Sequence, residues 1–179
     1  SLLYFWLRPF GFNADQAQDI LESCQSSDSG KLFESPSHLL NLDRDQLILA
    51  PIPTEFDSIS ISESDIEFLL PEGKYEILKL EGKEDLDKTR QNAMLDMDRL
   101  NFPLEIRSWQ QGDKFIPLGM KNEKKISDFL IDLKVPMVKK HAVKVLLSEG
   151  QIAWVIGFRI ADWAKSTAAT RKLLYLKTR

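Results

Sequence analysis

The stretch from Leu104 to Arg159 decides how this chain folds. Residues 104–121 read LEIRSWQQGDKFIPLGMK, residues 124–134 read KKISDFLIDLK, and residues 154–159 read WVIGFR. Apolar residues at every second position of the first segment are typical of a strand, whereas apolar residues three and four apart in the second are typical of a helix. The stretch therefore predicts strands around one short amphipathic helix, and most of its charged residues are Lys or Arg.

Charge is divided unevenly along the chain. Residues 1–100 hold 9 Lys and Arg against 20 Asp and Glu, a net charge of −11, and residues 101–179 hold 15 against 7, a net charge of +8. Such a division is expected when one part of a protein faces a polyanion. The alternative, that the basic and acidic parts attract each other, stays open at this point.

Bulk composition bounds the class of protein. A chain of 179 residues that is 43% hydrophobic and 28% charged is typical of one large or two small globular domains. No apolar run approaches the roughly 20 residues of a membrane span, and residues 1–9 lack the features of a signal peptide, so we interpret them as the end of a longer helix. The single Cys24 excludes an internal disulfide, and two distant histidines leave little for zinc. No membrane partner and no metal site are expected, and a reducing, cytoplasmic compartment fits best.

The fold class predicted from these patterns is α+β. Asn13 as N-cap and Gln16 as its capping-box partner predict a helix over 14–24, with Ala14, Ala17, Ile20, Leu21 and Cys24 on its apolar face. Mixed, mostly antiparallel strands follow, with one or two short helices near the end. We expect three parts: a helical segment over 1–29, a strand-rich acidic subdomain over 30–100, and a basic α+β domain over 101–179.

Strands are predicted wherever β-favouring runs end at turn residues. These runs are 46–50, 66–70, 75–80, 93–97, 104–109, 143–148, 151–157 and 172–177. Glu149-Gly150 predicts a two-residue hairpin turn. In the last strand either Leu174 and Leu176 or Leu173 and Tyr175 face inward, depending on register. The helix is expected over 124–134, with Ile126, Phe129, Leu130 and Leu133 on one face and Pro136 ending it.

Signatures of catalysis are absent from the sequence. It contains no Gly-rich phosphate loop, no paired histidines on a helix, no nucleophile elbow and no Cys-Xaa-Xaa-Cys. Cys24 and His141 lack the flanking context of a nucleophile and its base. The acidic run 81–87 is expected to be a solvated loop. It could coordinate a metal, but Glu84, Asp85 and Asp87 lack the Gly and the distal Glu of a calcium loop. No catalytic residue is therefore predicted.

A basic surface on defined scaffolding is the feature that remains. Three lysines within five positions at the expected helix start, Lys121, Lys124 and Lys125, oppose the helix dipole, so they require an external anion or the acidic part of the chain. RNA backbones are bound largely through phosphates and shape, which a rigid basic face can recognise. Trp109, Trp154 and Trp163 are candidates for base stacking or for core packing. The predicted RNA-contacting residues are Arg107, Lys121, Lys124, Lys125, Lys134, Lys139, Lys140 and Arg159, and Lys144 is expected on the same surface.

An ordered set of residues resembles a known family, the bacterial tRNA(Ile)-lysidine synthetases, in the C-terminal domain. The set comprises Arg107, Trp109, Gly112, Asp113, Phe115, Pro117, Gly119, Met120, Lys121, residues 124–129, Trp154, Val155, Gly157, Arg159, Ile160, Lys165, Thr167 and Thr170. Residues 1–100 resemble more loosely the end of the family's helical middle region and a connecting subdomain. Two differences are Asn122, where the family usually has Gly, and residues 159–163, which lack an acid and a base of the family pattern.

The resemblance implies a division of labour. The family's enzyme activates the first-anticodon-position cytidine of a CAU-anticodon isoleucine tRNA with ATP, then joins lysine to it. That chemistry belongs to an N-terminal ATP-pyrophosphatase domain, so ATP with magnesium and lysine are expected as its substrates, and this chain needs no cofactor. This chain is expected to hold the tRNA, with its last domain on the acceptor stem, and to be inactive alone. The resemblance carries the RNA-contacting role onto all eight predicted basic residues except Lys139.

Two other functions compete with this one. In the first, the chain is a protein-interaction module or homodimer in which the basic part packs on acidic surface. In the second, it is a stand-alone enzyme, which requires a polar pocket with perturbed titratable groups.

Overall fold

The structure, a computed structural model, describes residues 1–26, 30–82, 86 and 89–179. These residues form two compact units. The first contains residues 1–55 and 130–142, and the second contains residues 56–129 and 143–179. The domain boundaries expected from the sequence, 1–29, 30–100 and 101–179, stay a prediction. They are drawn from charge and motifs, whereas the two units are defined by contacts in space.

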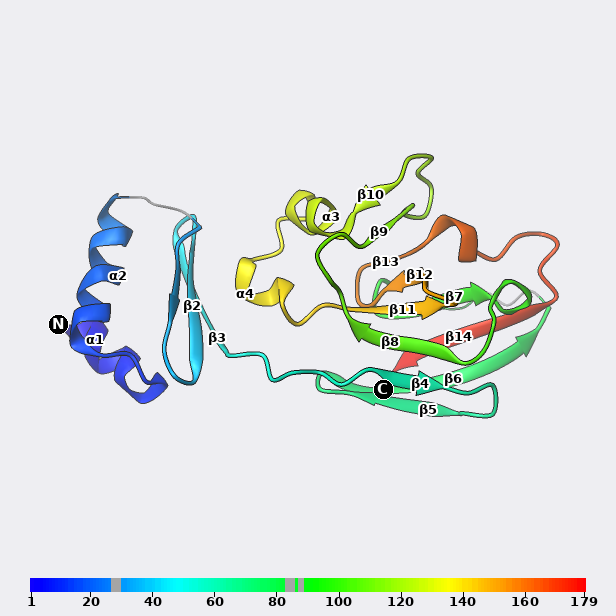
Figure 1. The fold of residues 1–179 in the computed structure, drawn as a ribbon, viewed down its shortest axis with the longest axis horizontal. Coiled ribbons are helices and arrows are strands. Elements are labelled where there is room, and N and C mark those ends of the chain that lie inside the picture. The colour runs from blue at the N-terminus through cyan, green and yellow to red at the C-terminus, as the bar shows by residue number, and fades with distance from the viewer. Residues whose placement is uncertain (27–29, 83–85, 87–88) are drawn as a thin grey trace. The chain divides into compact units, whose positions relative to one another are not determined.

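The first unit combines helices with a three-stranded sheet (Figure 1). Its helical elements are α1 (Leu2–Leu7), the 3-10 helix η1 (Arg8–Phe10), α2 (Ala14–Ser26) and α4 (Met137–Lys140). Its strands pair antiparallel in the order β1 (Leu32–Glu34), β2 (His38–Asp43) and β3 (Gln46–Pro51). The apolar core of this unit is made by Leu7, Phe12, Ile20 and Leu40.

Helix α2 begins with the capping box that the sequence predicts. The Asn13 Oδ1 accepts a hydrogen bond from the Gln16 N–H at 2.8 Å, and the Gln16 Oε1 accepts one from the Asn13 N–H at 3.1 Å. The pair satisfies two backbone donors near the helix start.

The buried face of α2 differs from the expected one. Ala17 and Ile20 are buried as predicted, but Ala14 and Cys24 are exposed and Ser23 is buried instead. Ser23 tolerates burial because its hydroxyl donates to the Asp19 carbonyl at 2.8 Å. A hydrogen-bonded hydroxyl costs little free energy to bury, so the buried face of α2 includes Ser23 and leaves Cys24 exposed.

The second unit is built on two antiparallel sheets. One has the strand order β13-β12-β11-β8-β4 and the other the order β5-β6-β14-β7. The first sheet contains β4 (Ile59–Ile61), β8 (Leu104–Ser108), β11 (Lys144–Ser148), β12 (Gln151–Val155) and β13 (Arg159–Ile160). The second contains β5 (Glu67–Leu70), β6 (Gly73–Glu81), β7 (Ala93–Asp96) and β14 (Lys172–Thr178). The short elements are η2 (Met97–Arg99), the hairpin β9 (Lys114–Phe115) and β10 (Lys124–Lys125), and η3 (Asp162–Ala164). Helix α3 (Ile126–Asp132) contributes residues 126–129 to this unit and residues 130–132 to the first.

One apolar core joins these two sheets. It takes Ile106 from β8 and Trp154 from β12 on one side, and Tyr75 from β6 and Leu174 from β14 on the other. The Tyr75 and Trp154 rings meet edge to face with their centroids 5.9 Å apart. The second unit is therefore a two-layer sandwich, in which the inner faces of both sheets are buried together (Figure 1).

Strand β14 follows the first of the two registers expected from its sequence, with Leu174 and Leu176 in the core between the two sheets. Leu173, Leu174, Tyr175 and Leu176 are all buried. β14 pairs with β6 on one edge and with β7 on the other, so it is an inner strand of its sheet. Burial on both faces removes the alternation between core and solvent that would distinguish one register from the other.

Most other sequence predictions of secondary structure are confirmed. The predicted strand runs form β3, β5, β6, β7, β8, β11, β12 and β14, and the fold class is α+β as predicted. Ser148 pairs with Gln151, and Glu149 and Gly150 between them have φ of 48° and 78°, so the two-residue hairpin turn is confirmed. Most of the acidic run 81–87 lies outside the described residues. No helix in the described part of the chain is long and apolar enough to cross a membrane.

Removing the α2 capping box tests how far this unit depends on a local signal. We expect Asn13→Ala to lower the free energy of unfolding of the first unit by about 1 kcal/mol, because the Gln16 N–H loses its acceptor. Urea titration followed by far-ultraviolet circular dichroism measures the change. The exposed Gln25→Ala in the same helix is the control and should not destabilise it. Equal behaviour of the two variants would contradict the prediction.

Candidate functional site

The eight basic residues predicted to contact RNA are divided between the two units. In the second unit lie Arg107 on β8, Lys121 between β9 and β10, Lys124 and Lys125 on β10, and Arg159 on β13. In the first unit lie Lys134, which follows α3, and Lys139 and Lys140 on α4. Their contact with RNA stays a prediction.

Arg107 is held within the chain by Asp113. Its Nη1 and Nη2 donate to the two carboxylate oxygens of Asp113 at 2.8 and 3.0 Å, and Nη1 also donates to the Ser108 carbonyl at 3.0 Å. The side chains of Arg107 and Asp113 are only 19% and 14% exposed. Burial acts to raise the pKa of Asp113, but the hydrogen bonds from Arg107 and the Gln110 N–H outweigh it and lower this pKa. The pair closes the turn between β8 and β9, so Arg107 has a structural partner whether or not it meets RNA.

Lys124 and Lys125 lie on a short strand that leads directly into a helix, and not within the helix. They form β10, in which Lys124 pairs with Phe115 and Lys125 with Lys114 of β9. The helix α3 begins only at Ile126, and its first turn carries Asp128. The expectation that the helix includes these lysines is therefore wrong, although Lys125 still directly precedes its first turn. The backbone of β10 pairs with β9 because apolar Phe115 is anchored edge to face on Phe129, with their ring centroids 5.0 Å apart.

Several predicted cations have no carboxylate partner. Of the described residues, none forms an ion pair with Lys121, Lys125 or Arg159 in the second unit, and all three are exposed. The guanidinium of Arg159 instead lies 6.0 Å from the centre of the Phe129 ring. Within the described part of the first unit, Lys134 and Lys139 are likewise exposed and without an ion pair. These groups keep their charge available to an external anion.

Other basic residues are neutralised inside the second unit. The expectation that Lys144 lies on the surface is wrong: its side chain is 5% exposed, pairs with Glu72 and lies 5.0 Å above the Phe56 ring. Burial of an ammonium requires such a partner. Arg179 pairs with Glu76. Part of the charge segregation in the sequence therefore becomes ion pairs between early and late segments, as the competing hypothesis expects, while Lys121, Lys125 and Arg159 stay outside them.

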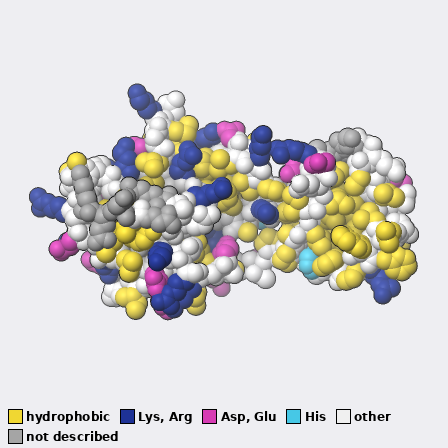
Figure 2. Space-filling view, turned by 180° about the vertical axis from the view of Figure 1, so that it is seen from behind, with side chains coloured by type: hydrophobic (Ala, Val, Ile, Leu, Met, Phe, Trp, Pro, Cys, Tyr) yellow, Lys and Arg dark blue, Asp and Glu magenta, His cyan; other side chains and the backbone are white. Residues whose placement is uncertain are grey.

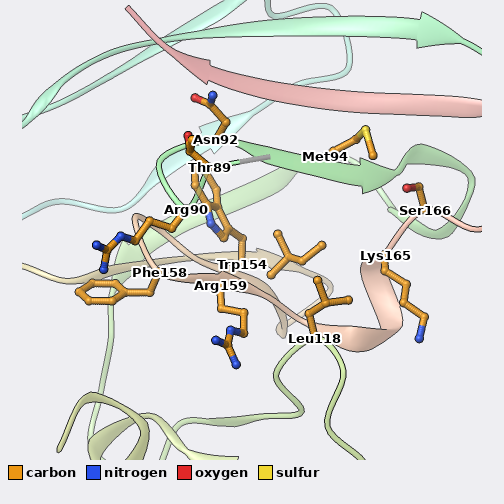
Figure 3. Close-up of a pocket in the computed structure, with 11 residues that line it drawn as sticks. Thr89, Arg90, Asn92, Met94, Leu118, Trp154, Phe158, Arg159, Lys165 and Ser166 are labelled. Carbon is orange, nitrogen blue, oxygen red and sulfur yellow. The ribbon is translucent and has the colours of Figure 1, made fainter. Parts of the chain in front are cut away.

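A pocket of about 340 Å³ opens in the second unit (Figure 3). It lies where β7, β12 and β13 meet the loop after β9 and the segment after η3. In the view of Figure 3, Arg90 and Phe158 lie on one side, Lys165 and Ser166 on the other, and Trp154 between them. The remaining lining is formed by Thr89, Asn92, Met94, Leu118, Arg159 and Ile160.

Backbone hydrogen bonds hold the walls of this pocket. The Leu118 N–H donates to the Ile160 carbonyl at 3.0 Å, and the Asp162 N–H donates to the Ile116 carbonyl at 2.8 Å. The Asp162 carboxylate accepts from the Gly119 N–H at 2.9 Å and from the Lys165 Nζ, and these bonds lower its pKa. The charge of Lys165 is thus shared with Asp162, whereas of the described residues none forms an ion pair with Arg90.

The three tryptophans considered for base stacking are at least partly buried. Trp163 is half-buried and donates its indole N–H to the Ile152 carbonyl at 2.8 Å, and Trp109 is also half-buried. Trp154 is fully buried, and among the described residues its Nε1 has no hydrogen-bond partner. Arg90 and Phe158 were not predicted as site residues from the sequence. Phe158 could have been predicted as a site residue, because it stands between Gly157 and Arg159 in the quoted run. No local pattern in the sequence distinguishes Arg90.

Comparison with known proteins identifies relatives of both units. Residues 1–52 match the family model described as the TilS substrate binding domain, and residues 104–175 match the TilS substrate C-terminal domain. The two matches together take in more than two thirds of the 179 residues. The solved "Crystal structure of TILS C-terminal domain" has a TM-score of 0.58 and 18% identity, covering 68% of this chain and 95% of that one, a likeness of fold.

Curated relatives extend the similarity over nearly the whole chain. The tRNA(Ile)-lysidine synthase of Parabacteroides distasonis is 32% identical over 176 residues, which is 97% of this chain and 40% of the relative. That of Bacteroides thetaiotaomicron is 34% identical over 177 residues, 99% of this chain and 39% of the relative. The chain thus spans about two fifths of the length of these relatives.

The Arg107–Asp113 pair generates a prediction about stability and pH. We expect Asp113→Asn to lower the free energy of unfolding at pH 7 by about 1–3 kcal/mol, because a partly buried guanidinium loses its charged acceptor. Since the folded-state pKa of Asp113 is lowered, this contribution is complete above the unfolded pKa of about 3.9 and is lost as the pH falls through the folded pKa. Urea denaturation at pH 7 and at stepwise lower pH measures it.

The exposed Asp57→Asn in the same unit is the matched control for this experiment. It also removes one carboxylate, but at a position open to solvent, and should change stability little. A difference between Asp113→Asn and the native chain that stays constant at every pH would show that the carboxylate charge is not what stabilises the turn.

Proposed function

This chain belongs to the tRNA(Ile)-lysidine synthase family, and from that premise we propose that it binds the tRNA substrate of such an enzyme. In this proposal the substrate is the isoleucine tRNA with the CAU anticodon, and the chain holds its acceptor stem. Joining lysine to the first anticodon cytidine, with ATP and magnesium, is assigned to a part of the enzyme that this chain does not match. The role of the chain is to bind and position.

The observation that carries the proposal is a set of exposed cations that form no ion pair with any described residue and stand on hydrogen-bonded elements. Lys125 stands on β10, Arg159 on β13, and Lys121 in the loop that β9 and β10 hold at both ends. An exposed cation that its own chain does not neutralise binds phosphate without first breaking an ion pair. Figure 2 shows Lys and Arg side chains at several places on the face it presents, as contacts to an RNA backbone require.

The scaffold explains why such contacts position an RNA rather than only attract it. The β9–β10 hairpin is anchored through Phe115 on Phe129, and the Ile126 N–H donates to the Asp113 carbonyl at 2.9 Å. Asp113 is in turn fixed by Arg107. Lys124 and Lys125 therefore project from a braced element, so their charges keep a defined spacing. Fixed spacing selects a backbone of matching geometry.

Reversing the charge of the hairpin tests the proposal. We expect Lys124→Glu with Lys125→Glu to weaken binding of the CAU-anticodon isoleucine tRNA and to reduce the slope of log affinity against log salt by about one for each phosphate that the variant no longer binds. Filter binding at several salt concentrations measures both. The matched control is Lys172→Glu with Lys177→Glu, which makes the same change in net charge on β14, where both residues are exposed. Equal weakening in the two variants would contradict a defined surface at the hairpin.

The competing function, association between protein chains, makes a different prediction for the same variants. Sedimentation of the native chain would then give a dimer that dissociates with salt, and Lys124→Glu with Lys125→Glu would shift it to monomer without any effect on tRNA. A monomer at all salt concentrations together with the tRNA effect supports the proposed function.

A further inference from the structure

The pocket in the second unit contains a buried donor that the described residues leave unused. The indole of Trp154 is fully buried and lines this pocket, and its Nε1 has no hydrogen-bond partner among the described residues. Buried polar groups are nearly always hydrogen-bonded, so an unpaired donor on a residue that lines a cavity is available to an acceptor that enters the cavity. Shielding from water also strengthens the bond that such an acceptor would make.

The rest of the lining combines apolar and cationic side chains. Met94, Leu118, Phe158 and Ile160 supply apolar surface, and Phe158 is half-buried, so part of its ring is open to contact. Arg90 and Arg159 are exposed and have no carboxylate partner in the described part of the chain, whereas Lys165 is paired with Asp162. A ligand that fits these groups has a flat apolar part with hydrogen-bonding atoms at its edge and an anionic group beside it.

We propose that this pocket receives one unpaired nucleotide of an RNA. The base enters against Phe158 and accepts the Trp154 N–H at its edge, and the adjoining phosphate lies against Arg90 and Arg159. Aromatic and guanidinium groups recognise unstacked bases of single-stranded RNA in this way. The inference rests on the proposed function, since it names the part of the RNA that this unit recognises.

The size of the pocket selects among parts of an RNA. About 340 Å³ is at the small end of ligand pockets, which suits one nucleotide and excludes a longer segment. A paired base is stacked and cannot enter, so the nucleotide comes from an end or a loop. Leu118, which is 41% exposed, is free enough to turn aside for an entering base.

The first experiment uses free nucleotides as probes of the pocket. Adenosine and cytidine 5′-monophosphates are titrated into the ¹⁵N-labelled chain, and the indole N–H signals are followed by NMR. The Trp154 signal, identified by its disappearance in Trp154→Phe, should shift on addition of nucleotide. Arg90→Ala should weaken this binding about tenfold, as expected when a charge-assisted bond to phosphate is removed. The exposed Arg171→Ala outside the pocket is the control and should leave the affinity unchanged.

The second experiment distinguishes an RNA end from a free nucleotide. We expect an RNA hairpin with a single-stranded 3′ overhang to bind about tenfold more tightly than the blunt hairpin, because only the overhang supplies an unstacked base. Arg90→Ala with Phe158→Leu should abolish this preference while binding of the blunt hairpin persists. Both substitutions lie at the pocket mouth, so the fold is retained.

Each outcome bears on one of the two proposals. Equal binding of overhang and blunt hairpins, with no shift of the Trp154 signal, would overturn the pocket proposal and leave RNA binding intact. A shift with free nucleotide but no preference for the overhang would overturn the RNA source in favour of a free nucleotide. Failure of every RNA to bind would overturn the proposed function, and the NMR titration would still decide whether the pocket takes a nucleotide.

Discussion

The apolar contact between the two sheets of the second unit is the interaction on which the rest of that unit depends. Trp154, Tyr75 and Leu174 meet there and are all buried. Removing this surface from water is the main favourable contribution to folding of such a sandwich. Arg159 stands on β13, which pairs with β12 of this sandwich, and hydrogen bonds tie the segments with Leu118 and Lys165 to the same edge. Their positions are therefore set by the core together with these hydrogen bonds.

The electrostatics of the second unit divide its cations into two groups. Arg107 and Lys144 are drawn inward and each has a carboxylate partner, Asp113 and Glu72. Lys121, Lys125 and Arg159 remain exposed without one among the described residues. A count of basic residues along the sequence does not separate these groups, because the separation depends on which carboxylates the fold brings close. The paired cations stabilise the loops, and the unpaired ones give the surface around them a positive electrostatic potential.

Local signals in the sequence predicted local structure well. The capping box at Asn13, the turn at Glu149-Gly150 and the alternation of Leu104 and Ile106 depend on neighbours in the chain, and all three are confirmed. The features that could not be predicted depend on distant partners. Lys144 is buried because Glu72 reaches it, β14 loses its alternation because both faces are covered, and Arg90 joins Trp154 at the pocket across more than sixty residues of sequence. The assignment of Lys124 and Lys125 to a helix failed because a two-residue strand carries almost no pattern of its own.

The order of strands in the second sheet has a consequence for biosynthesis. β14, formed by Lys172–Thr178, lies between β6 and β7, and in the described part of the sheet these two strands pair with β14 and not with each other. While the ribosome is still adding the residues before 172, β6 and β7 have emerged with their facing edges unpaired. Such edges are open to pairing with other chains until the last strand arrives. Completion of this sheet is therefore expected to be slow, since the pairing of β14 with β6 joins residues about a hundred positions apart.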